Sequence, residues 1–488
     1  MGGRQAFPVP WLVFADLDNK GAPMILDAAD CTGTLDRHAQ VAIVGAGPAG
    51  MTLARELSDV AEVLLIEAGG TAPDPLQESL LAGDIGGMAY PLTETRARRL
   101  GGSAQLWAGY CAIFDPHDFT VREWVPGSGW PFGVNELRPW LARAARLLNL
   151  GAADFDAACC AAPHWPPDDT GLLVPTIWRF GDPTQRFERG HGDEPSGAGV
   201  TTLVNACVTE IRLAAGHDSA SELTVRTLRG QQGRVTADLF VLACGGLETA
   251  RLLLASDAQV PNGVGNASGK VGRHFMEHPH RAISGLRLED AGMFAGWTKR
   301  GRDPEGREYM PAMGLSPAAQ CEHQVLNARA HVYRTPAMHA GERPRMGLFM
   351  EQAPNPRSRV VLSNSTDALG QRRLRLEWHL NDLDRMSYEM TARLLAELLC
   401  HAGLASQAAP VSFDREPVLH SNHHLGTTRM SLKAGDGVVD ADCRLHDLDN
   451  VYILGGSVFP TVSWANPTFT LMALTFRLAD HLRYVVSR

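Results

Sequence analysis

The sequence predicts an α/β fold, α+β overall, in which a Rossmann-like nucleotide-binding domain is interleaved with a domain built on an antiparallel sheet. At 488 residues the chain is too long for one ordinary hydrophobic core and suits two domains. A strand, a glycine-rich turn and a helix follow one another over 41–57. Alternating strands around 359–362 and 374–378 indicate an antiparallel sheet, which we expect to lie under the substrate.

The nucleotide-binding signal begins with the apolar run 41–44, which is typical of a buried parallel strand. Gly45 permits the tight turn that follows, and Gly47 lets the backbone approach a pyrophosphate. Gly50 allows the helix over 51–57 to pack closely on the strand. A diphosphate would then lie at the N-terminus of this helix, where free N–H groups and the helix dipole favour an anion.

A second strand, 62–66, ends at Glu67. This acid follows Gly47 by the roughly 20 residues at which a carboxylate can accept hydrogen bonds from the ribose hydroxyls. A carboxylate there also repels a 2′-phosphate, which disfavours NADP. These residues leave FAD and NAD undecided.

Composition excludes several other classes of function. A net charge of −9 disfavours a nucleic-acid partner, because phosphates require a basic surface. No stretch approaches the roughly 20 apolar residues that span a bilayer, and the N-terminus lacks the layout of a secretory signal. We therefore expect a cytoplasmic protein with no membrane partner. The nine cysteines include no Cys-x-x-Cys pair, which favours reduced thiols.

Further blocks lie along the middle of the chain. The arginine-rich stretch 96–100, which can offer charge to an anionic cofactor, precedes a glycine-rich loop at 101–109. A segment at 205–211 is followed by a strand at 237–243. A glycine turn and a helix at 249–254 come next. Taken singly, each of these could be sheet core or a surface turn.

The C-terminal blocks are the most specific. His423 opens the run His-His-Leu-Gly-Thr-Thr at 423–428, and the segment 450–460 contains a paired glycine. Asn466 then begins Asn-Pro-Thr-Phe-Thr, which leads into an apolar helix at 471–474. In order and spacing, all these blocks together resemble the glucose-methanol-choline (GMC) family from residue 41 to the C-terminus.

The resemblance implies FAD as the cofactor and an architecture similar to GMC proteins and p-hydroxybenzoate hydroxylase. It implies an FAD-binding domain formed by 38–130, 200–278 and 426–488, and a substrate-binding cap formed by 131–199 and 279–425. In the matching blocks the implied cofactor-binding residues are Gly45, Gly47, Pro48, Ala49, Gly50, Glu67, Ala68, Arg99, Gly101, Gly102, Ser103, Trp107, Val208, Ala243, Gly245, Gly456, Asn466, Pro467 and Thr468.

The resemblance also implies the catalytic residues. Oxidation of an alcohol by a flavin requires loss of the hydroxyl proton and transfer of a hydride to flavin N5, and histidine is suited to take the proton near neutral pH. By position in the motif, His423 is the base and Asn466 orients the substrate oxygen. The neighbouring His420 and His424 are interpreted as structural. No Cys or acid stands at zinc-like spacing from these histidines, so no metal is expected.

One position departs from part of the family. Certain sugar oxidases of the family hold FAD covalently through a histidine in the glycine-rich loop, and Leu106 stands at the corresponding position here. We therefore expect a non-covalent flavin.

The substrate is less determined. Resemblance to the bacterial sugar-oxidising branch favours a small-molecule alcohol such as a sugar, a cyclitol or an aminoglycoside-like compound of specialised metabolism. Dioxygen or another acceptor would reoxidise the flavin. The alternatives are the same chemistry on a bulky apolar alcohol such as a sterol, a redox-silent flavoprotein (a lyase or an interaction subunit), and an NAD-dependent dehydrogenase.

Overall fold

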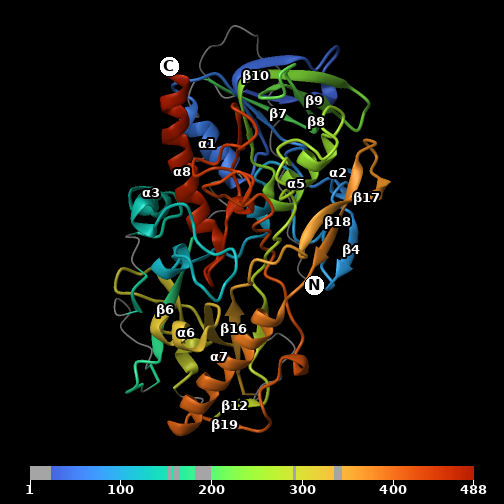
Figure 1. Cartoon of the computed structure of the whole chain (residues 1–488). Coiled ribbons are helices and arrows are strands. Elements are labelled where there is room, and N and C mark those ends of the chain that lie inside the picture. The colour runs from blue at the N-terminus through green and yellow to red at the C-terminus, as the bar shows by residue number, and fades with distance from the viewer. Residues whose placement is uncertain are drawn as a thin grey trace, which may run out of the picture.

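The computed structural model describes residues 24–151, 155–157, 165–166, 168–181, 199–289, 293–334 and 343–488. In Figure 1 a mixed sheet with helices occupies the upper half of the molecule, and a second, antiparallel sheet with its own helices occupies the lower half. The long C-terminal helix α8 (Pro467–Val486) runs down one side of the upper half, next to α1 (Pro48–Leu57) and α3 (Val134–Leu147).

The upper sheet has eight described strands in the order β1-β7-β3-β2-β10-β9-β8, with β20 also paired to β10. The strands β1, β7, β3, β2, β10 and β20 are parallel, whereas β9 and β8 continue the sheet antiparallel. Their bounds are β1 Met24–Asp27, β2 Arg37–Val44, β3 Val63–Ile66, β7 Val200–Val204, β8 Cys207–Leu213, β9 Ala220–Arg226, β10 Gln232–Leu242 and β20 Val451–Ile453.

The centre of this sheet is buried on both faces, as the apolar runs predicted. All four residues of β3 are buried, and so are the last four of β2, 41–44. The strand predicted at 62–66 is thus β3, and the one at 237–243 is the end of β10. The helix predicted at 249–254 lies within α5 (Gly245–Ala255), which follows β10 directly.

The lower sheet is antiparallel, in the order β11-β16-β15-β14-β6-β5, with β13 paired to β14. Its bounds are β5 Tyr110–Cys111, β6 Leu173–Phe180, β11 His280–Ala282, β13 Gly301–Arg302, β14 Glu308–Leu315, β15 Ala328–Tyr333 and β16 Arg345–Met350. The helix α7 (Asp382–His401) packs on this sheet around a separate apolar core. The shorter elements are α2 Pro75–Ser79, α6 Pro317–His323, β12 Leu286–Leu288 and β19 Ala405–Gln407.

The strands predicted at 359–362 and 374–378 form an antiparallel pair, β17 (Arg359–Thr366) and β18 (Arg372–Trp378). Their predicted place under the substrate is wrong. They join β4 (Asp84–Gly87) in a separate three-stranded sheet, and none of their residues lines the cavity described below. The reason is their apolar face, since Leu374 and Leu376 are buried in the same core as α5.

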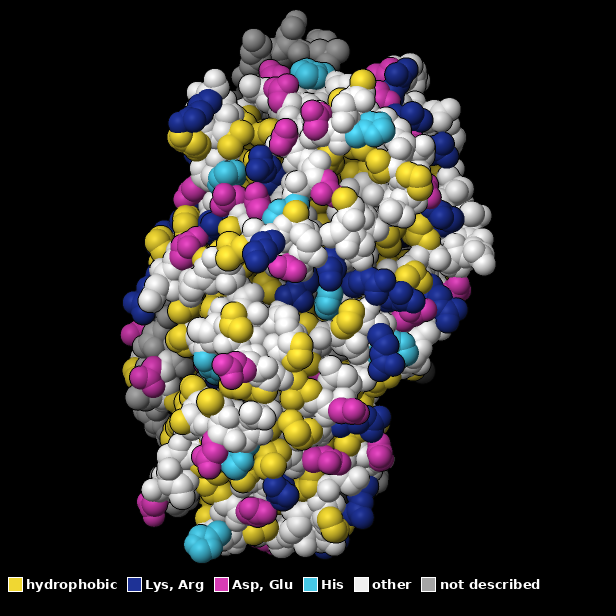
Figure 2. Space-filling model, viewed as in Figure 1, with side chains coloured by type: hydrophobic (Ala, Val, Ile, Leu, Met, Phe, Trp, Pro, Cys, Tyr) yellow, Lys and Arg dark blue, Asp and Glu magenta, His cyan; other side chains and the backbone are white. Residues whose placement is uncertain are grey.

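Figure 2 shows acidic and basic side chains mixed over the visible face, with a group of basic ones at mid-height near α5 and β18. Among the described residues, no helix combines the length and apolarity that a membrane span requires.

Candidate active site

A cavity of about 550 Å³ lies between the two halves of the molecule. Most of the residues predicted to bind the cofactor or to act on the substrate line it together: Gly45, Gly47, Pro48, Ala49, Glu67, Ala68, Gly102, Ser103, Trp107, Val208, Ala243, Gly245, Gly456, His423, Asn466, Pro467 and Thr468. Gly50, Arg99 and Gly101 do not line it.

The glycine turn after β2 is packed so tightly that side chains are excluded. Gly45 has a φ of +104°, and a Cβ there would lie 2.5 Å from the carbonyl oxygen of Ala243. A Cβ on Gly50 would lie 2.0 Å from the carbonyl oxygen of Gly45. Gly50 therefore allows α1 to pack on the turn, although it does not face the cavity. At Gly47, by contrast, a Cβ would meet no atom within 4 Å, so the backbone is open toward the cavity.

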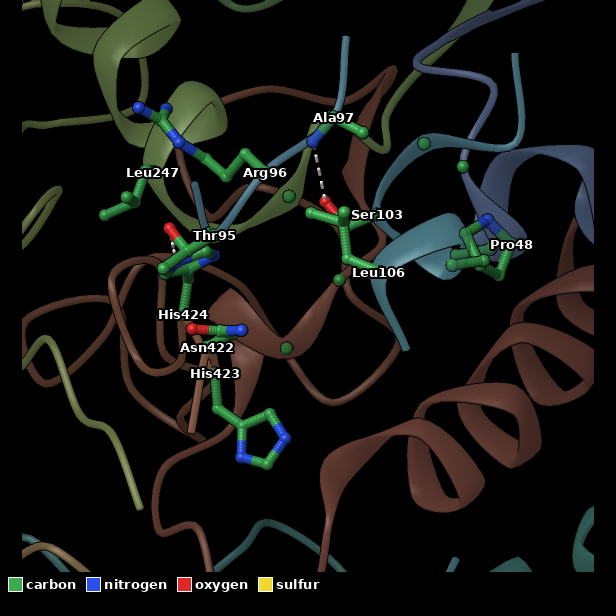
Figure 3. Close-up of a pocket in the computed structure, with 18 of the residues that line it drawn as sticks. Pro48, Thr95, Arg96, Ala97, Ser103, Leu106, Leu247, Asn422, His423 and His424 are labelled. Carbon is green, nitrogen blue, oxygen red and sulfur yellow. Dashed lines mark hydrogen bonds between the residues drawn. The ribbon is translucent and has the colours of Figure 1, made fainter. Parts of the chain in front are cut away.

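The second glycine loop lies directly on the first. The N–H of Gly101 donates to the carbonyl oxygen of Ala46 at 2.9 Å, and a Cβ on Gly102 would lie 3.0 Å from Cα of Gly47. Both Gly101 and Gly102 have positive φ. In Figure 3, Ser103 accepts a hydrogen bond from the N–H of Ala97, and this loop runs between Pro48 and the 422–424 segment. The two loops thus form one wall at the N-terminus of α1.

Glu67 is buried at the end of β3. Its Oε2 accepts from the N–H of Ala46 and its Oε1 from the N–H of Gly69, both at 2.9 Å. Burial raises the pKa of this carboxyl, and the two backbone donors act in the opposite direction. Each carboxylate oxygen keeps a further lone pair, so Glu67 can still accept from a ligand hydroxyl.

The arginine stretch points differently from the prediction. Arg99 donates to Gln105 and stands near Glu78, away from the cavity, whereas Arg96 and Arg98 line it. Arg96 is paired with Glu248 at 2.5 Å. The positive charges that face the cavity are therefore those of Arg96 and Arg98. Sequence alone gives no register for a loop, so the face of this stretch could not be assigned in advance.

At the opposite end of the cavity, His423 lies on a loop held by a buried carboxylate. Glu277 accepts from the backbone N–H of His423 at 2.7 Å, from that of Ser421 at 3.1 Å and from that of His278 at 2.5 Å. It also accepts from the hydroxyl of Tyr90 at 3.0 Å. Figure 3 shows His424 turned to Thr95, while the ring of His423 extends from the loop in another direction.

Two side chains lie next to the ring nitrogens of His423. Its Nδ1 lies 2.8 Å from Nδ1 of His278, and its Nε2 lies 3.5 Å from Nδ2 of Asn466. Trp178 donates its indole N–H to Oδ1 of Asn466 at 2.9 Å. Asn466 is the residue at which α8 begins, so the helix fixes the position of its amide.

The imidazole of His423 is neutral in this environment. Burial lowers the pKa of His423 well below the usual range of histidine, and His278 and His424 act in the same direction. Burial likewise lowers the pKa of His278 to about 4. A neutral imidazole can accept a proton from a hydroxyl, which is the first requirement for a general base.

The antiparallel sheet contributes a largely aromatic wall to the cavity, formed by Tyr110, Trp178, His280, His331 and Phe349 together with Met310. Seven aromatic and polar residues of the segment 280–425 would suit a hydroxyl-rich ligand by type: Trp297, Tyr309, His331, Tyr333, Glu351, Gln352 and Trp378. Of these, only His331 lines the cavity. Trp297 and Trp378 are core residues, and Glu351 is paired with Arg122 at 2.5 Å. In β6, Trp178 and Phe180 alternate with Arg179, but this pattern does not identify which face of the strand is turned to the cavity.

The residues at the nucleotide end fit an FAD. The open backbone at Gly47 and the N-terminus of α1 provide N–H groups for a diphosphate. Two buried donors, Nε of Arg98 and Nε1 of Trp107, have no partner among the described residues. Within the described part of the chain, no group of three or more His, Cys, Asp or Glu side chains could hold a metal ion.

The fold and the position of the cavity are of the type with which oxidoreductases bind a dinucleotide cofactor. Residues 354–475 match the family model described as GMC oxidoreductase. Among curated relatives, 6'''-hydroxyparomomycin C oxidase of Streptomyces lividus is 26% identical, with 92% of this chain and 93% of that protein covered. The fructose dehydrogenase large subunit of Gluconobacter japonicus is 27% identical, with 78% and 79% covered.

A crystal structure of formate oxidase superimposes with a TM-score of 0.63 at 18% identity, covering 93% of this chain and 99% of that one. Over residues 354–475 the chain is thus similar to the GMC oxidoreductases, and its fold is the Rossmann-like fold of such flavoproteins with an antiparallel-sheet cap.

Proposed function

We propose that this enzyme binds FAD non-covalently and oxidises a hydroxyl group of a sugar-like or cyclitol-like substrate to a carbonyl. The observation that carries the proposal is the pairing of a neutral His423 with Asn466 at one end of a cavity whose other end suits a dinucleotide. The flavin, when bound, supplies the acceptor for the hydride that leaves the alcohol carbon.

In this proposal Nε2 of His423 takes the hydroxyl proton. Nδ2 of Asn466 donates to the same substrate oxygen and stabilises the negative charge that develops on it. Asn466 is uncharged and does not compete for the proton. The aromatic wall of the antiparallel sheet, with Phe349 beside His423 and Trp178 packed on Phe349, excludes water and presents a flat surface to the substrate.

Charge favours a neutral substrate. Among the described residues that line the cavity, the acids are Glu67, at the end of β3, and Glu248, in the first turn of α5, where it is paired with Arg96. The carboxyl nearest His423 is that of Glu277, which binds the backbone of the loop and does not line the cavity. A polycationic aminoglycoside would therefore find no described carboxylate in the cavity wall beside His423, whereas a neutral sugar requires none. Relatives named for an aminoglycoside-type compound and for fructose support both ligand types, so the experiment must compare them.

The test is the visible spectrum of the purified protein, repeated anaerobically with sugars, cyclitols, aminoglycosides and sterols. We expect a flavin spectrum that is bleached by a sugar or a cyclitol. Bleaching by a sterol alone would replace the proposed substrate with a bulky apolar alcohol. A yellow protein bleached by no alcohol would favour the redox-silent alternative. A colourless protein that takes up no FAD would overturn the proposal, and an NAD-dependent enzyme would then have to be considered.

Replacement of the base provides the matched variant. His423→Ala should retain FAD, because the ring is at the opposite end of the cavity from the glycine turn. It should slow anaerobic flavin reduction by about 10² to 10⁴, the usual contribution of a general base. His420→Ala is the control, because His420 bonds to Asn422 outside this pair. Equal rates in both variants would contradict the assignment of His423.

A further inference from the structure

His278 is fully buried behind the base, does not line the cavity, and is fixed on three sides. Its ring stacks on Phe349, with centroids 5.1 Å apart and planes 11° apart. Its Nε2 lies 3.0 Å from the carbonyl oxygens of both Val462 and Ser463. Ser463 has a φ of +55°, a backbone conformation that only surrounding structure maintains in a residue other than glycine.

These contacts determine where the proton on His278 is. A carbonyl oxygen can only accept, so Nε2 of His278 must carry the hydrogen. Burial lowers the pKa of His278 to about 4, so the ring is neutral at pH 7 and has one proton only. Its Nδ1 is therefore bare and can only accept a hydrogen bond.

The same reasoning then applies to the base. Nδ1 of His423 lies 2.8 Å from the bare Nδ1 of His278, with the two rings at 88° to each other. Two bare nitrogens at this distance would repel, so Nδ1 of His423 must carry a hydrogen and donate it. The lone pair of neutral His423 is then on Nε2, the nitrogen that lies beside Nδ2 of Asn466.

We propose that His278 is a positioning residue that holds His423 in the Nδ1–H tautomer, so that the basic lone pair on Nε2 faces the substrate. In solution, a histidine side chain prefers the opposite tautomer, with the proton on Nε2, and a base in that form could not accept from the substrate. When Nε2 of His423 has taken the proton, Nδ1 of His278 continues to accept from the resulting imidazolium. The inference rests on the proposed function for its catalytic meaning, but not for the tautomer itself.

The direct test is a long-range ¹H–¹⁵N correlation spectrum of the flavin-containing protein labelled with ¹⁵N-histidine. The nitrogen shifts and the cross-peak pattern distinguish the two tautomers, and the signal of His423 is identified by its loss in His423→Asn. We expect the Nδ1–H form for His423 at neutral pH. The Nε2–H form in the wild-type protein would overturn the proposal without any variant.

Two substitutions separate positioning from packing. In His278→Asn the amide oxygen can occupy the place of Nδ1 and accept from His423, whereas His278→Leu fills the space without an acceptor. We expect His278→Asn to keep the Nδ1–H form and a near wild-type rate. His278→Leu should convert His423 to the Nε2–H form and lower kcat by roughly 10² or more, within the range for loss of a general base, with KM changed much less.

Equal rates in the two variants, or the Nδ1–H form in His278→Leu, would contradict the role of His278. If neither variant folds, the spectrum of the wild-type protein still shows whether His423 carries its proton on Nδ1 or on Nε2. The proposed function can fail separately. A protein that oxidises no alcohol but shows the Nδ1–H form retains the His278 contact, whereas an active enzyme with the Nε2–H form refutes only this inference.

Discussion

Trp178 donates its indole N–H to Oδ1 of Asn466 at 2.9 Å, and this contact determines which way the Asn466 amide points. An indole N–H can only donate, so the amide oxygen must face it. The amide nitrogen therefore faces Nε2 of His423, at 3.5 Å. A residue of the cap thus orients a residue at the start of α8.

We expect Trp178→Phe to lower the rate of anaerobic flavin reduction by up to about tenfold. The substitution keeps an aromatic ring but removes one hydrogen bond, whose net value is about 0.5–1.5 kcal/mol, and 1.4 kcal/mol corresponds to a factor of ten. Stopped-flow absorbance measures this rate, with the alcohol that bleaches the flavin of the wild-type protein as the substrate. Trp124→Phe is the control, because Trp124 donates to the carbonyl of Val325 and does not line the cavity. Equal effects of both substitutions would show that the amide orientation does not matter.

Gly47→Ala should weaken FAD binding without unfolding the protein. A Cβ at this position meets no protein atom within 4 Å, so the fold tolerates it, but it would fill the space through which a pyrophosphate approaches the backbone. We expect the Kd for FAD to rise by about tenfold or more, that is by about 1.4 kcal/mol. Titration of the apoprotein by calorimetry measures the Kd. Gly133→Ala, where a Cβ also meets nothing, should change neither Kd nor thermal stability.

The rate of flavin reduction should not decline on the acid side until the pH is well below about 6.5, the ordinary pKa of histidine. Burial lowers the pKa of His423, so its neutral, proton-accepting form persists to lower pH than for an exposed histidine. Anaerobic reduction measured from pH 5 to 8 would locate this limb. The limb should stay in place in Glu277→Gln, which removes a nearby carboxyl whose pKa burial raises to about 7. If the acid-side decline of the rate shifts to another pH in Glu277→Gln, it reports titration of the Glu277 carboxyl and not of His423.

The flavin should be released completely by acid precipitation of the protein. By the resemblance to the GMC family, we infer that Leu106 stands where certain sugar oxidases have a histidine linked to the flavin, and a leucine side chain cannot form such a bond. Cys244 also lines the cavity, but burial raises the pKa of its thiol to about 12, so the reactive thiolate is absent at neutral pH. A colourless pellet and a yellow supernatant are expected, and a yellow pellet would refute non-covalent binding.

The sequence determined the nucleotide half of the molecule well because its signals are local. The turn between β2 and α1 requires glycine at 45, where φ is +104°, and at 50, where a Cβ would collide with the carbonyl oxygen of Gly45. Runs of four apolar residues at 41–44 and 63–66 are buried as central parallel strands must be. The motif at 423–428 and Asn466 likewise placed two residues that the structure brings together.

Only the tertiary structure decided which side chains face the cavity and which partners set their chemistry. The direction of Arg96, Arg98 and Arg99 depends on the path of a loop, for which the sequence gives no register. The β17–β18 hairpin has a strand pattern that fits either sheet, and its placement followed from which core could bury its apolar face. His278 is 145 residues from His423 along the chain, yet their nitrogens are 2.8 Å apart. A hydrogen bond at that separation arises from the packing of distant segments, so no local pattern in the sequence could reveal it.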